Sequence, residues 1–375
     1  MATTGLQLLS LVKPDGELEV SLANVPVPDP GPDEVVVRIE AAPINPSDLG
    51  LLIGPADVAT ARRGGTAEAP TLVARVPERI LPALATRLGK PLPVGNEGAG
   101  TVIAAGSSPA AQALKGKLVA AWGGAMYAQY RCIHADMCLE LPAGARAEDG
   151  ASAFINPLTA LYFLETVKRE GQRALVNTAG ASNLGQMLVR LCARDGIELV
   201  SIVRSAEQAA VLKQLGATHV LDSSASGFAG DLVDAMAETK ALIAFDAIGG
   251  GKLGGQILGA MEQAVNRGVT VYNRYGSSTV KQLFIYGALD MAPTEIARTF
   301  GLAWSVSGWL LSHWMVKLGM DKANELKRRV ASELTTTFAS TYSRRVTLRE
   351  VIEVDVMKAY KQMATGEKYL ITPNA

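Results

Sequence analysis

The chain has 375 residues, of which 48% are hydrophobic and 19% are charged, a composition that is typical of globular proteins and excludes a disordered chain. This length exceeds what one hydrophobic core usually serves, so two domains are expected. Lysine plus arginine equals aspartate plus glutamate at 36 each, which argues against nucleic acid or an anionic membrane as the main partner.

The first 150 residues are predicted to form mainly β structure. Short apolar runs alternate there with turns rich in proline and glycine, a pattern typical of strands. The stretch from Gly54 to Pro93 is rich in alanine, arginine and proline, and we interpret it as an excursion from the β domain with one helix, roughly Pro77 to Leu88. The predicted strands are Leu18–Leu22, Glu34–Ile39, Gly98–Ala105 and Leu118–Ala121.

From residue 151 on, predicted strands alternate with predicted helices. Such βαβ units pack into a parallel sheet, and right-handed crossovers make it doubly wound, so the fold class is α/β. The strands are Ala174–Val176, Glu198–Val203, His219–Leu221, Leu242–Asp246 and Val269–Tyr272, and the helices are Pro157–Lys168, Gly185–Arg194, Ala206–Leu215 and Phe228–Glu238. After these, a strand (Thr337–Thr341), a helix (Thr347–Thr365) and the closing Gly366–Ile371 are expected to return to the first domain.

The loop Asn177–Gln186 joins the first of these strands to a helix, as a phosphate-binding loop does. Dinucleotide loops usually read G-x-G-x-x-G, whereas this loop places Ala179, Ser182 and Gly185 in the corresponding positions. Ala179 suits the turn only if its φ is negative. Backbone amides at the helix start, near Asn183 and Leu184, would point at a phosphate with the positive end of the helix dipole. The alternative interpretation is an ordinary strand–turn–helix connection.

The end of the second strand predicts which dinucleotide binds. An acidic residue about 20 positions after the loop would accept a hydrogen bond from the 2′-hydroxyl of NAD. Here Arg204 stands 19 residues after Gly185 and is followed by Ser205. A cation and a hydroxyl donor suit the 2′-phosphate of NADPH. The alternative is an arginine that is merely solvated.

Several further stretches carry a resemblance to a known family. Read together, they resemble the zinc-independent medium-chain dehydrogenase/reductases of the quinone oxidoreductase type, and most of all the mitochondrial-type trans-2-enoyl-CoA reductases. The stretches are Ala42–Asp48, Gly95–Gly98, Ile155–Ala160, the loop Asn177–Gln186, Ile202–Arg204, Leu215–Val220, Tyr275-Gly276, Ser307–Trp314 and Gly366–Lys368.

The resemblance implies a Rossmann domain (residues 151–324) inserted into a GroES-like β-rich domain (residues 1–150 plus 325–375). It also implies NADPH as the cofactor, a small-molecule substrate and a homodimer. Carried over by position, the cofactor-binding residues would be Asn156, Thr159, Ala181, Ser182, Asn183, Leu184, Arg204, Ser205, Tyr275, Gly276, Ser277, Trp309, Leu310, Leu311 and Lys368.

No metal site is expected. A catalytic zinc needs three protein ligands, usually cysteine, histidine or carboxylate. Where the zinc-dependent relatives have cysteine and histidine, this chain has Asn45 and Asn96. The three histidines, at 134, 219 and 313, share no ligand spacing.

The proton donor of the family is absent. Enoyl reductases of this branch use a tyrosine shortly after I-N-P-S-D, and the matching position here is Ala56. Tyr127 is a possible substitute, although its setting is more typical of strand packing. Asn45 is the candidate catalytic residue, because its amide could donate to a carbonyl oxygen; otherwise it caps a loop.

Two functional hypotheses therefore stay open. The first is an NADPH-dependent reductase that transfers hydride to a quinone or to an activated C=C bond, such as that of an enone or an enoyl thioester. The second is a non-catalytic nucleotide-binding protein that kept the fold and lost the tyrosine.

Other sequence features concern the surroundings of the site. The arginines and the lysine between residues 54 and 93 could form a lid or a patch for the phosphates of coenzyme A, or simply a solvated face. Three unclustered cysteines suggest a reducing compartment. With no signal-peptide pattern and no uninterrupted apolar span, we expect a soluble, cytoplasmic protein without a membrane partner.

Overall fold

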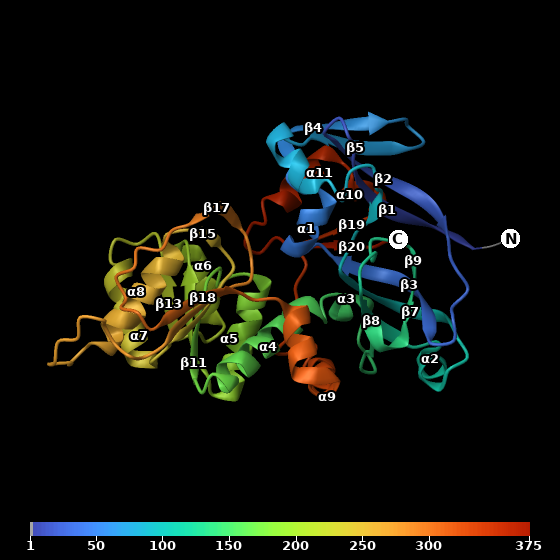
Figure 1. The fold of residues 1–375 in the computed structure, drawn as a ribbon. Coiled ribbons are helices and arrows are strands. Elements are labelled where there is room, and N and C mark those ends of the chain that lie inside the picture. Colours follow the sequence, from blue (N-terminus) through green and yellow to red (C-terminus); the bar gives the residue numbers. More distant parts are fainter. Residues whose placement is uncertain (1–2) are drawn as a thin grey trace. The chain divides into compact units, whose positions relative to one another are not determined.

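The computed structural model describes residues 3–375, which divide into two compact units (Figure 1). Unit 1 contains the described residues up to Ile155 together with Lys327–Ala375, and unit 2 contains Asn156–Leu326. The two ends of the chain thus belong to the same unit, and unit 2 is formed by the continuous segment between them.

Unit 1 contains a five-stranded antiparallel sheet in the order β4-β5-β2-β1-β6. The stretch from Gly54 to Pro93 supplies three of its strands, so its interpretation as an excursion from the β domain was wrong. The helix predicted in that stretch is a short 3₁₀ helix, Glu78–Leu84, because Pro82 cannot donate the backbone hydrogen bond of an α-helix. The strands are β1 (Thr4–Val12), β2 (Glu17–Pro26), β4 (Asp57–Gly65), β5 (Pro70–Arg75) and β6 (Leu92–Pro93).

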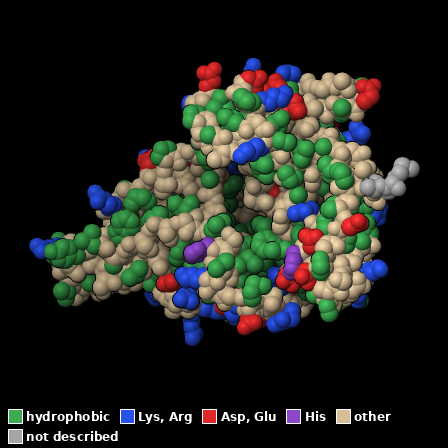
Figure 2. All heavy atoms as spheres, turned by 45° about the vertical axis from the view of Figure 1, so that its right-hand side comes forward, with side chains coloured by type: hydrophobic (Ala, Val, Ile, Leu, Met, Phe, Trp, Pro, Cys, Tyr) green, Lys and Arg blue, Asp and Glu red, His purple; other side chains and the backbone are tan. Residues whose placement is uncertain are grey.

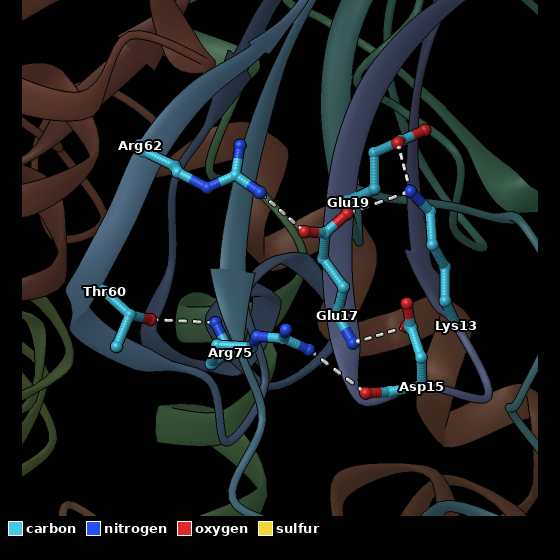
Figure 3. Close-up of polar contacts among 7 residues, drawn as sticks. All are labelled: Lys13, Asp15, Glu17, Glu19, Thr60, Arg62 and Arg75. Atoms are coloured by element: carbon cyan, nitrogen blue, oxygen red, sulfur yellow. Dashed lines mark hydrogen bonds and ion pairs between the residues drawn. The ribbon is translucent and has the colours of Figure 1, made fainter.

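Polar contacts fasten the outer strands of this sheet, as Figure 3 shows. Arg62 on β4 pairs with Glu17 on β2 at 2.8 Å, and Arg75 on β5 donates to the backbone carbonyl of Asp15 at 3.2 Å. A third arginine of the stretch, Arg87, donates to the hydroxyl of Ser10 at 2.8 Å. These guanidinium groups hold strands together, which favours a structural role over a patch for phosphates.

The second sheet of unit 1 has seven strands and receives the end of the chain. Its order is β10-β8-β7-β3-β20-β19, with β9 also paired to β3. The predicted strands 34–39, 98–105 and 118–121 are confirmed within β3, β7 and β8. The strands are β3 (Glu34–Pro43), β7 (Glu97–Ala105), β8 (Leu118–Trp122), β9 (Tyr130–His134), β10 (Cys138–Glu140), β19 (Arg344–Val346) and β20 (Tyr369–Ile371).

Short helices complete unit 1. The predicted helix 347–365 is divided in two, and the predicted strand 337–341 is wrong, because the amide of Phe338 donates to the carbonyl of Glu333 and continues the turn after α9. The helices are α1 (Pro46–Leu52), α2 (Pro109–Leu114), η2 (Ala135–Met137), α3 (Ala147–Gly150), α10 (Leu348–Val351) and α11 (Val354–Lys361).

Unit 2 is a doubly wound α/β unit, which confirms the predicted fold class. All six strands run parallel in the order β13-β12-β11-β14-β16-β18, the 3-2-1-4-5-6 order of the Rossmann fold. Helices α7 and α8 lie side by side in Figure 1. The strands are β11 (Ala174–Asn177), β12 (Glu198–Val203), β13 (His219–Asp222), β14 (Ile243–Asp246), β16 (Lys281–Ile285) and β18 (Trp304–Gly308).

The remaining elements of unit 2 are its helices and one small sheet. The helices are α4 (Ile155–Arg169), α5 (Asn183–Asp195), α6 (Ala206–Gln214), α7 (Phe228–Thr239), α8 (Leu253–Val265) and α9 (Leu311–Ser332), and the small sheet pairs β15 (Gly249–Gly251) with β17 (Asp290–Thr294). Helix α9 is kinked at Gly319 and continues into unit 1. The strand predicted over 269–272 was wrong: Val271 and Tyr272 are 78% and 88% exposed, and the fifth sheet strand starts only at Lys281.

The surface carries both signs of charge. On the face shown in Figure 2, lysine and arginine side chains are interspersed with aspartate and glutamate, in keeping with the equal totals of the sequence. None of the helices formed by residues 3–375 combines the length and the apolar character needed to cross a membrane.

Candidate functional site

The loop between β11 and α5 has the form of a phosphate-binding turn. Ser182 caps α5, and its hydroxyl oxygen accepts a hydrogen bond from the backbone amide of Gly185 at 3.1 Å. The helix begins at Asn183, so the first backbone amides of α5 lie at the carboxyl end of β11. Backbone amides at a helix start and the positive end of the helix dipole make this position suited to an anion.

Ala179 adopts a left-handed conformation, with φ of +51°. The condition set for alanine at this position, a negative φ, is therefore not met. The turn is closed by two backbone hydrogen bonds, from Ser182 to the carbonyl of Ala179 at 2.9 Å and from Gly180 to the carbonyl of Ile202 at 2.8 Å. Left-handed backbone costs an alanine about 1 kcal/mol, so a glycine is not required here but would relax the turn.

Gly185 is the position at which only glycine fits. A Cβ atom there would lie 1.9 Å from the carbonyl oxygen of Gly180. The helix can therefore approach the loop only because this residue has no side chain, which is the role expected of the third glycine in a dinucleotide loop.

Arg204 and Ser205 lie at the same edge of the sheet as the loop. Strands β11 and β12 are parallel neighbours, so their carboxyl ends meet. The Arg204 side chain is exposed, while its backbone amide donates to the side chain of Gln208 at 3.0 Å. Ser205 caps α6 by accepting from the amide of Gln208 at 3.3 Å, and its hydroxyl also hydrogen-bonds the Glu207 carboxylate, which lowers the pKa of Glu207.

A network that sequence reasoning missed fastens β11 to β14 at this edge. The Thr178 hydroxyl donates to a carboxylate oxygen of Asp246 at 2.7 Å and accepts from the amide of Ala247 at 2.8 Å. The other Asp246 oxygen accepts from the amide of Gly249 at 3.1 Å. The sequence does contain a signal for this network, namely an aspartate at the end of an apolar strand that is followed by glycines.

The placement of Tyr275, Gly276 and Ser277 in the nicotinamide pocket requires correction. They precede β16, so they lie at the amino edge of the parallel sheet, opposite the phosphate-binding loop. Tyr275 and Gly276 line a hollow of about 880 Å³ there, and Ser277 donates its hydroxyl to Glu262, which is paired with the buried Lys281.

A second Y-G pair, Tyr286-Gly287, occupies the expected place. It directly follows β16, and the Tyr286 hydroxyl donates to the side-chain oxygen of Asn177, the last residue of β11, at 3.2 Å. The pair could have been recognised from the sequence, because it follows the apolar run Leu283–Ile285 whereas the first pair does not.

The other predicted residues of unit 2 lie on α4 and after β18. On α4, Thr159 is buried and Asn156 is half-buried. The Trp309 indole is 5% exposed, packs edge-on against Phe163 and donates to the hydroxyl of Thr166 at 3.3 Å, so it belongs to the interior of unit 2. Of the pocket residues expected after β18, Leu310 is exposed and Leu311 is half-buried. In the loop between β11 and α5, Ala181 and Leu184 are buried.

In unit 1, Asn45 is turned toward a buried carboxylate. Its side-chain amide donates to Glu97 at 2.8 Å, and the second Glu97 oxygen accepts from the amides of Phe154 and Ile155 at 2.9 Å each. Asn45 and Glu97 are 2% and 1% exposed. One of the two N–H donors of the Asn45 amide thus holds Glu97, and donation by the other to a substrate carbonyl stays a prediction.

Asp48 is the second buried carboxylate of unit 1. It accepts from the backbone amides of Asn45 at 2.9 Å and Asn96 at 2.8 Å. Burial raises the pKa of Asp48 to about 7, and the two amides oppose that rise. Burial also raises the pKa of Glu97, opposed by the nearby charge of Lys368.

Lys368 is brought to these carboxylates by the end of the chain. Its backbone carbonyl accepts from the amide of Ser343 at 3.0 Å, directly before β20. The ammonium is buried, lies 5.7 Å from the ring centre of Tyr342, and forms no hydrogen bond with any described residue. Burial lowers the pKa of Lys368 to about 8, opposed by Glu97 and Asp48. We call Asn45, Asp48, Glu97, Tyr342 and Lys368 the buried polar cluster.

Neither position considered for the family's tyrosine supplies a free acid. Ala56 is 9% exposed and packs in the core of unit 1. Tyr127 is fully buried, its hydroxyl donates to the carbonyl of Pro43 at 2.9 Å, and burial raises its pKa well above the usual value. Across residues 3–375, no three histidine, cysteine or acidic side chains are grouped so that they could hold a metal ion.

Comparisons with known proteins agree with this architecture. Residues 31–143 match the alcohol dehydrogenase GroES-like domain family. The chain is 27% identical to the quinone oxidoreductase of Pseudomonas aeruginosa over 224 residues, covering 59% of this chain and 60% of that protein. It is 27% identical to the mitochondrial enoyl-acyl-carrier-protein reductase of Xenopus tropicalis over 207 residues, covering 53% and 51%.

A solved structure resembles the whole chain. A Mesorhizobium loti protein assigned as an NADPH:quinone reductase matches with a TM-score of 0.74 and 28% identity, covering 100% of both chains. By contrast, the alignments with the two curated relatives span between about half and three fifths of their lengths.

We predict that Gly185→Ala destabilises the protein by about 1–3 kcal/mol, because the new methyl group collides with the Gly180 carbonyl. Urea unfolding followed by circular dichroism measures the effect. The matched control is Gly230→Ala on α7, where a Cβ meets nothing within 4 Å and alanine is the better helix former. Equal stability of the two variants would contradict the assigned role of Gly185.

Proposed function

We propose that the chain is an NADPH-dependent, zinc-independent reductase, because it is similar to quinone oxidoreductases and enoyl reductases and because residues 31–143 match the alcohol dehydrogenase GroES-like domain family. Its substrate would be a quinone or a C=C bond activated by a carbonyl group. The observation that carries the proposal is the carboxyl edge of the six-stranded sheet, where a capped phosphate-binding turn and the Arg204-Ser205 pair follow neighbouring strands.

The residues of this edge fit NADPH. The start of α5, from Ala181 to Leu184, would hold the pyrophosphate through backbone amides, and the Ser182 hydroxyl retains a proton to donate. Arg204 and Ser205 would hold the 2′-phosphate with a charge-assisted contact and a hydroxyl donor. When bound, the nicotinamide supplies the hydride.

The nicotinamide end would be positioned by residues after β14, β16 and β18 and on α4. Tyr286 and Gly287 follow β16 directly, and Leu310 is exposed after β18. Asn156 and Thr159 on α4 would complete this end, as the resemblance implies. The role of the protein in this step is to fix the orientation of the reacting carbon, since hydride transfer depends mainly on positioning.

The substrate class follows from the acid that is missing at Ala56. A quinone gains stability on becoming a quinol and can take its proton from water, whereas an enoyl thioester depends on a positioned donor worth about 10²–10⁴-fold in rate. We therefore propose that quinones are reduced readily, and that reduction of enones or enoyl thioesters requires a donor from elsewhere in the chain.

Binding and turnover test this function together. Quenching of the four tryptophans by NADPH should report binding, and NADPH oxidation should follow when quinones, enones and enoyl thioesters are supplied. Absence of binding by both NADPH and NADH would contradict the proposal. Binding without oxidation by any acceptor would favour a non-catalytic nucleotide-binding protein, a function that the occupied Asn45 amide also allows.

We predict that Arg204→Glu weakens NADPH binding by about 1–3 kcal/mol, because a charge-assisted contact is replaced by a repulsion. The affinity for NADH, which has no 2′-phosphate, should not fall. Isothermal titration calorimetry measures both affinities. Arg298→Glu is the control, since Arg298 is also exposed on unit 2 but precedes β18 at the amino edge. An unchanged affinity of Arg204→Glu for NADPH would refute the placement of the 2′-phosphate.

We propose that the protein is a homodimer. Strand β18 is the outermost strand of the six-stranded sheet, and unit 2 exposes large hydrophobic side chains that a second copy would cover, among them Val271, Tyr272 and Met291 at 78–88% exposure. Light scattering coupled to size exclusion should give twice the chain mass of 39.4 kDa. A mass of one chain at micromolar concentration would contradict the dimer.

A further inference from the structure

The hollow of about 880 Å³ in unit 2 lies at the amino edge of the six-stranded sheet. Its walls come from the end of α8, from the segment before β16 and from the segment before β18, together with Val233 of α7. Volumes of about 300–1,000 Å³ are typical of small-molecule sites. Because the phosphate-binding turn lies at the opposite edge of the sheet, the proposed cofactor site does not account for this hollow.

Two glycines bring the segments before β16 and β18 into close contact. A Cβ atom on Gly276 would lie 2.5 Å from the Cα atom of Gly301, and both residues have a positive φ, of +79° and +67°. The amide of Leu302 donates to the carbonyl of Tyr275 at 3.0 Å. The two segments that line the hollow are therefore fixed to each other by their backbones.

Glu262 is the only acidic residue among the described residues that line the hollow, and its charge is neutralised. It pairs with the buried ammonium of Lys281 at 2.5 Å and accepts from the hydroxyl and the amide of Ser277 at 2.5 and 2.7 Å. Burial by itself would raise the pKa of Glu262, but the hydrogen bonds from Lys281 and Ser277 lower it to about 2. Glu262 thus stays ionised and paired, and it does not repel an anion in the hollow.

Three arginines line the hollow, and two of them have no carboxylate partner within residues 3–375. Arg267 pairs with Asp234. The guanidinium of Arg274 lies 4.5 Å from the ring centre of Tyr275 and donates one of its five N–H groups to the hydroxyl of that residue. Arg298 forms no hydrogen bond or ion pair with any described residue. Because the two ion pairs cancel, Arg274 and Arg298 give the hollow two uncompensated positive charges.

Apolar side chains also line the hollow. Tyr275 and Leu302 are 52% and 71% exposed, and Val233 is half-buried. Covering such side chains with an apolar group is favourable because it removes them from water. None of the three side chains named above for the dimer contact is among the residues that line the hollow. The ligand that fits has an anionic group for the arginines and an apolar group for these side chains.

We propose that this hollow binds a phosphate monoester whose organic part is apolar or aromatic, as a ligand distinct from NADPH. A phosphate monoester carries about 1.5 to 2 negative charges near pH 7, which matches the two uncompensated arginines. Arginine suits it because the planar guanidinium donates to phosphate oxygens in pairs. The organic group would cover Tyr275 and Leu302. This proposal goes beyond the proposed function and does not rest on it, since every residue that lines the hollow belongs to unit 2 and none is a predicted contact of NADPH except Tyr275 and Gly276, whose placement is corrected above.

Phenyl phosphate is the probe, and isothermal titration calorimetry measures its binding. We expect one equivalent to bind per chain, with an affinity about 10-fold or more above that of inorganic phosphate, because the phenyl ring covers apolar surface. Phenol lacks the charge and should bind far more weakly. Absence of saturable phenyl phosphate binding at millimolar concentration, or an affinity no higher than that of either reference compound, would overturn the proposal.

The variants Arg274→Gln and Arg298→Gln locate the probe in the hollow. Each removes a charge-assisted contact, so the affinity for phenyl phosphate should fall by about 10–100-fold. The matched control is Arg169→Gln, since Arg169 is an exposed arginine at the end of α4 that does not line the hollow. Thermal unfolding should confirm that the three variants are folded. An unchanged affinity in either hollow variant, or an equal loss in the control, would refute the site.

Competition with NADPH separates this site from the carboxyl edge of the sheet. Saturating NADPH should leave the binding of phenyl phosphate unchanged, because the two ligands occupy opposite edges. Displacement of the probe by NADPH would place it at the phosphate-binding turn and overturn the proposal. If the protein binds no NADPH while the two hollow variants still lose the probe, the proposed function is refuted and the site in the hollow stands.

Discussion

The parallel alignment of β11, β12, β14 and β16 is the constraint on which the candidate cofactor site depends. Parallel strands place all their carboxyl ends at one edge, so the loop after β11, the Arg204-Ser205 pair after β12 and Tyr286 after β16 are neighbours in space although more than 100 residues separate the first from the last. The hydrogen bond from Tyr286 to Asn177 and the bonds from Thr178 to Asp246 fasten this edge across the strands.

A comparable constraint acts in unit 1, where the tail of the chain pairs with β3. Without that pairing, Lys368 would be an ordinary lysine in a glycine-containing turn. With it, a cation lies among two buried carboxylates whose hydrogen bonds are satisfied by Asn45 and by backbone amides. Burying charges is costly, so an arrangement that leaves the ammonium without a hydrogen bond is more consistent with a task for that group than with stability alone.

Single residues show how far sequence reasoning reached. The alternation of strands and helices correctly predicted unit 2. Arg204, at a position where an acidic residue would favour NAD, predicts a preference for a 2′-phosphate, and this stays a prediction. The positive φ of Ala179 was not foreseen, because the turn is closed by the bond from Ser182 to the Ala179 carbonyl and by the bond from Gly180 to the carbonyl of Ile202, which is remote in sequence. The sequence analysis assigned the pair Tyr275-Gly276, which precedes β16, to the nicotinamide pocket, rather than Tyr286-Gly287, which follows it. A two-residue motif by itself does not show whether it lies before or after a strand.

The sequence by itself determined the class of fold, the absence of the family's tyrosine at Ala56 and the composition of the phosphate-binding loop. Periodicity, residue type and spacing along the chain are local properties, and they are legible without coordinates. Only the tertiary structure decided that the Asn45 amide is engaged by Glu97, that Trp309 is part of the interior and that the Lys368 ammonium is buried without a hydrogen bond. These properties depend on contacts between segments that are far apart in sequence. The period of a helix or a strand can be seen in the sequence of one chain, whereas burial and long-range hydrogen bonds leave no such pattern.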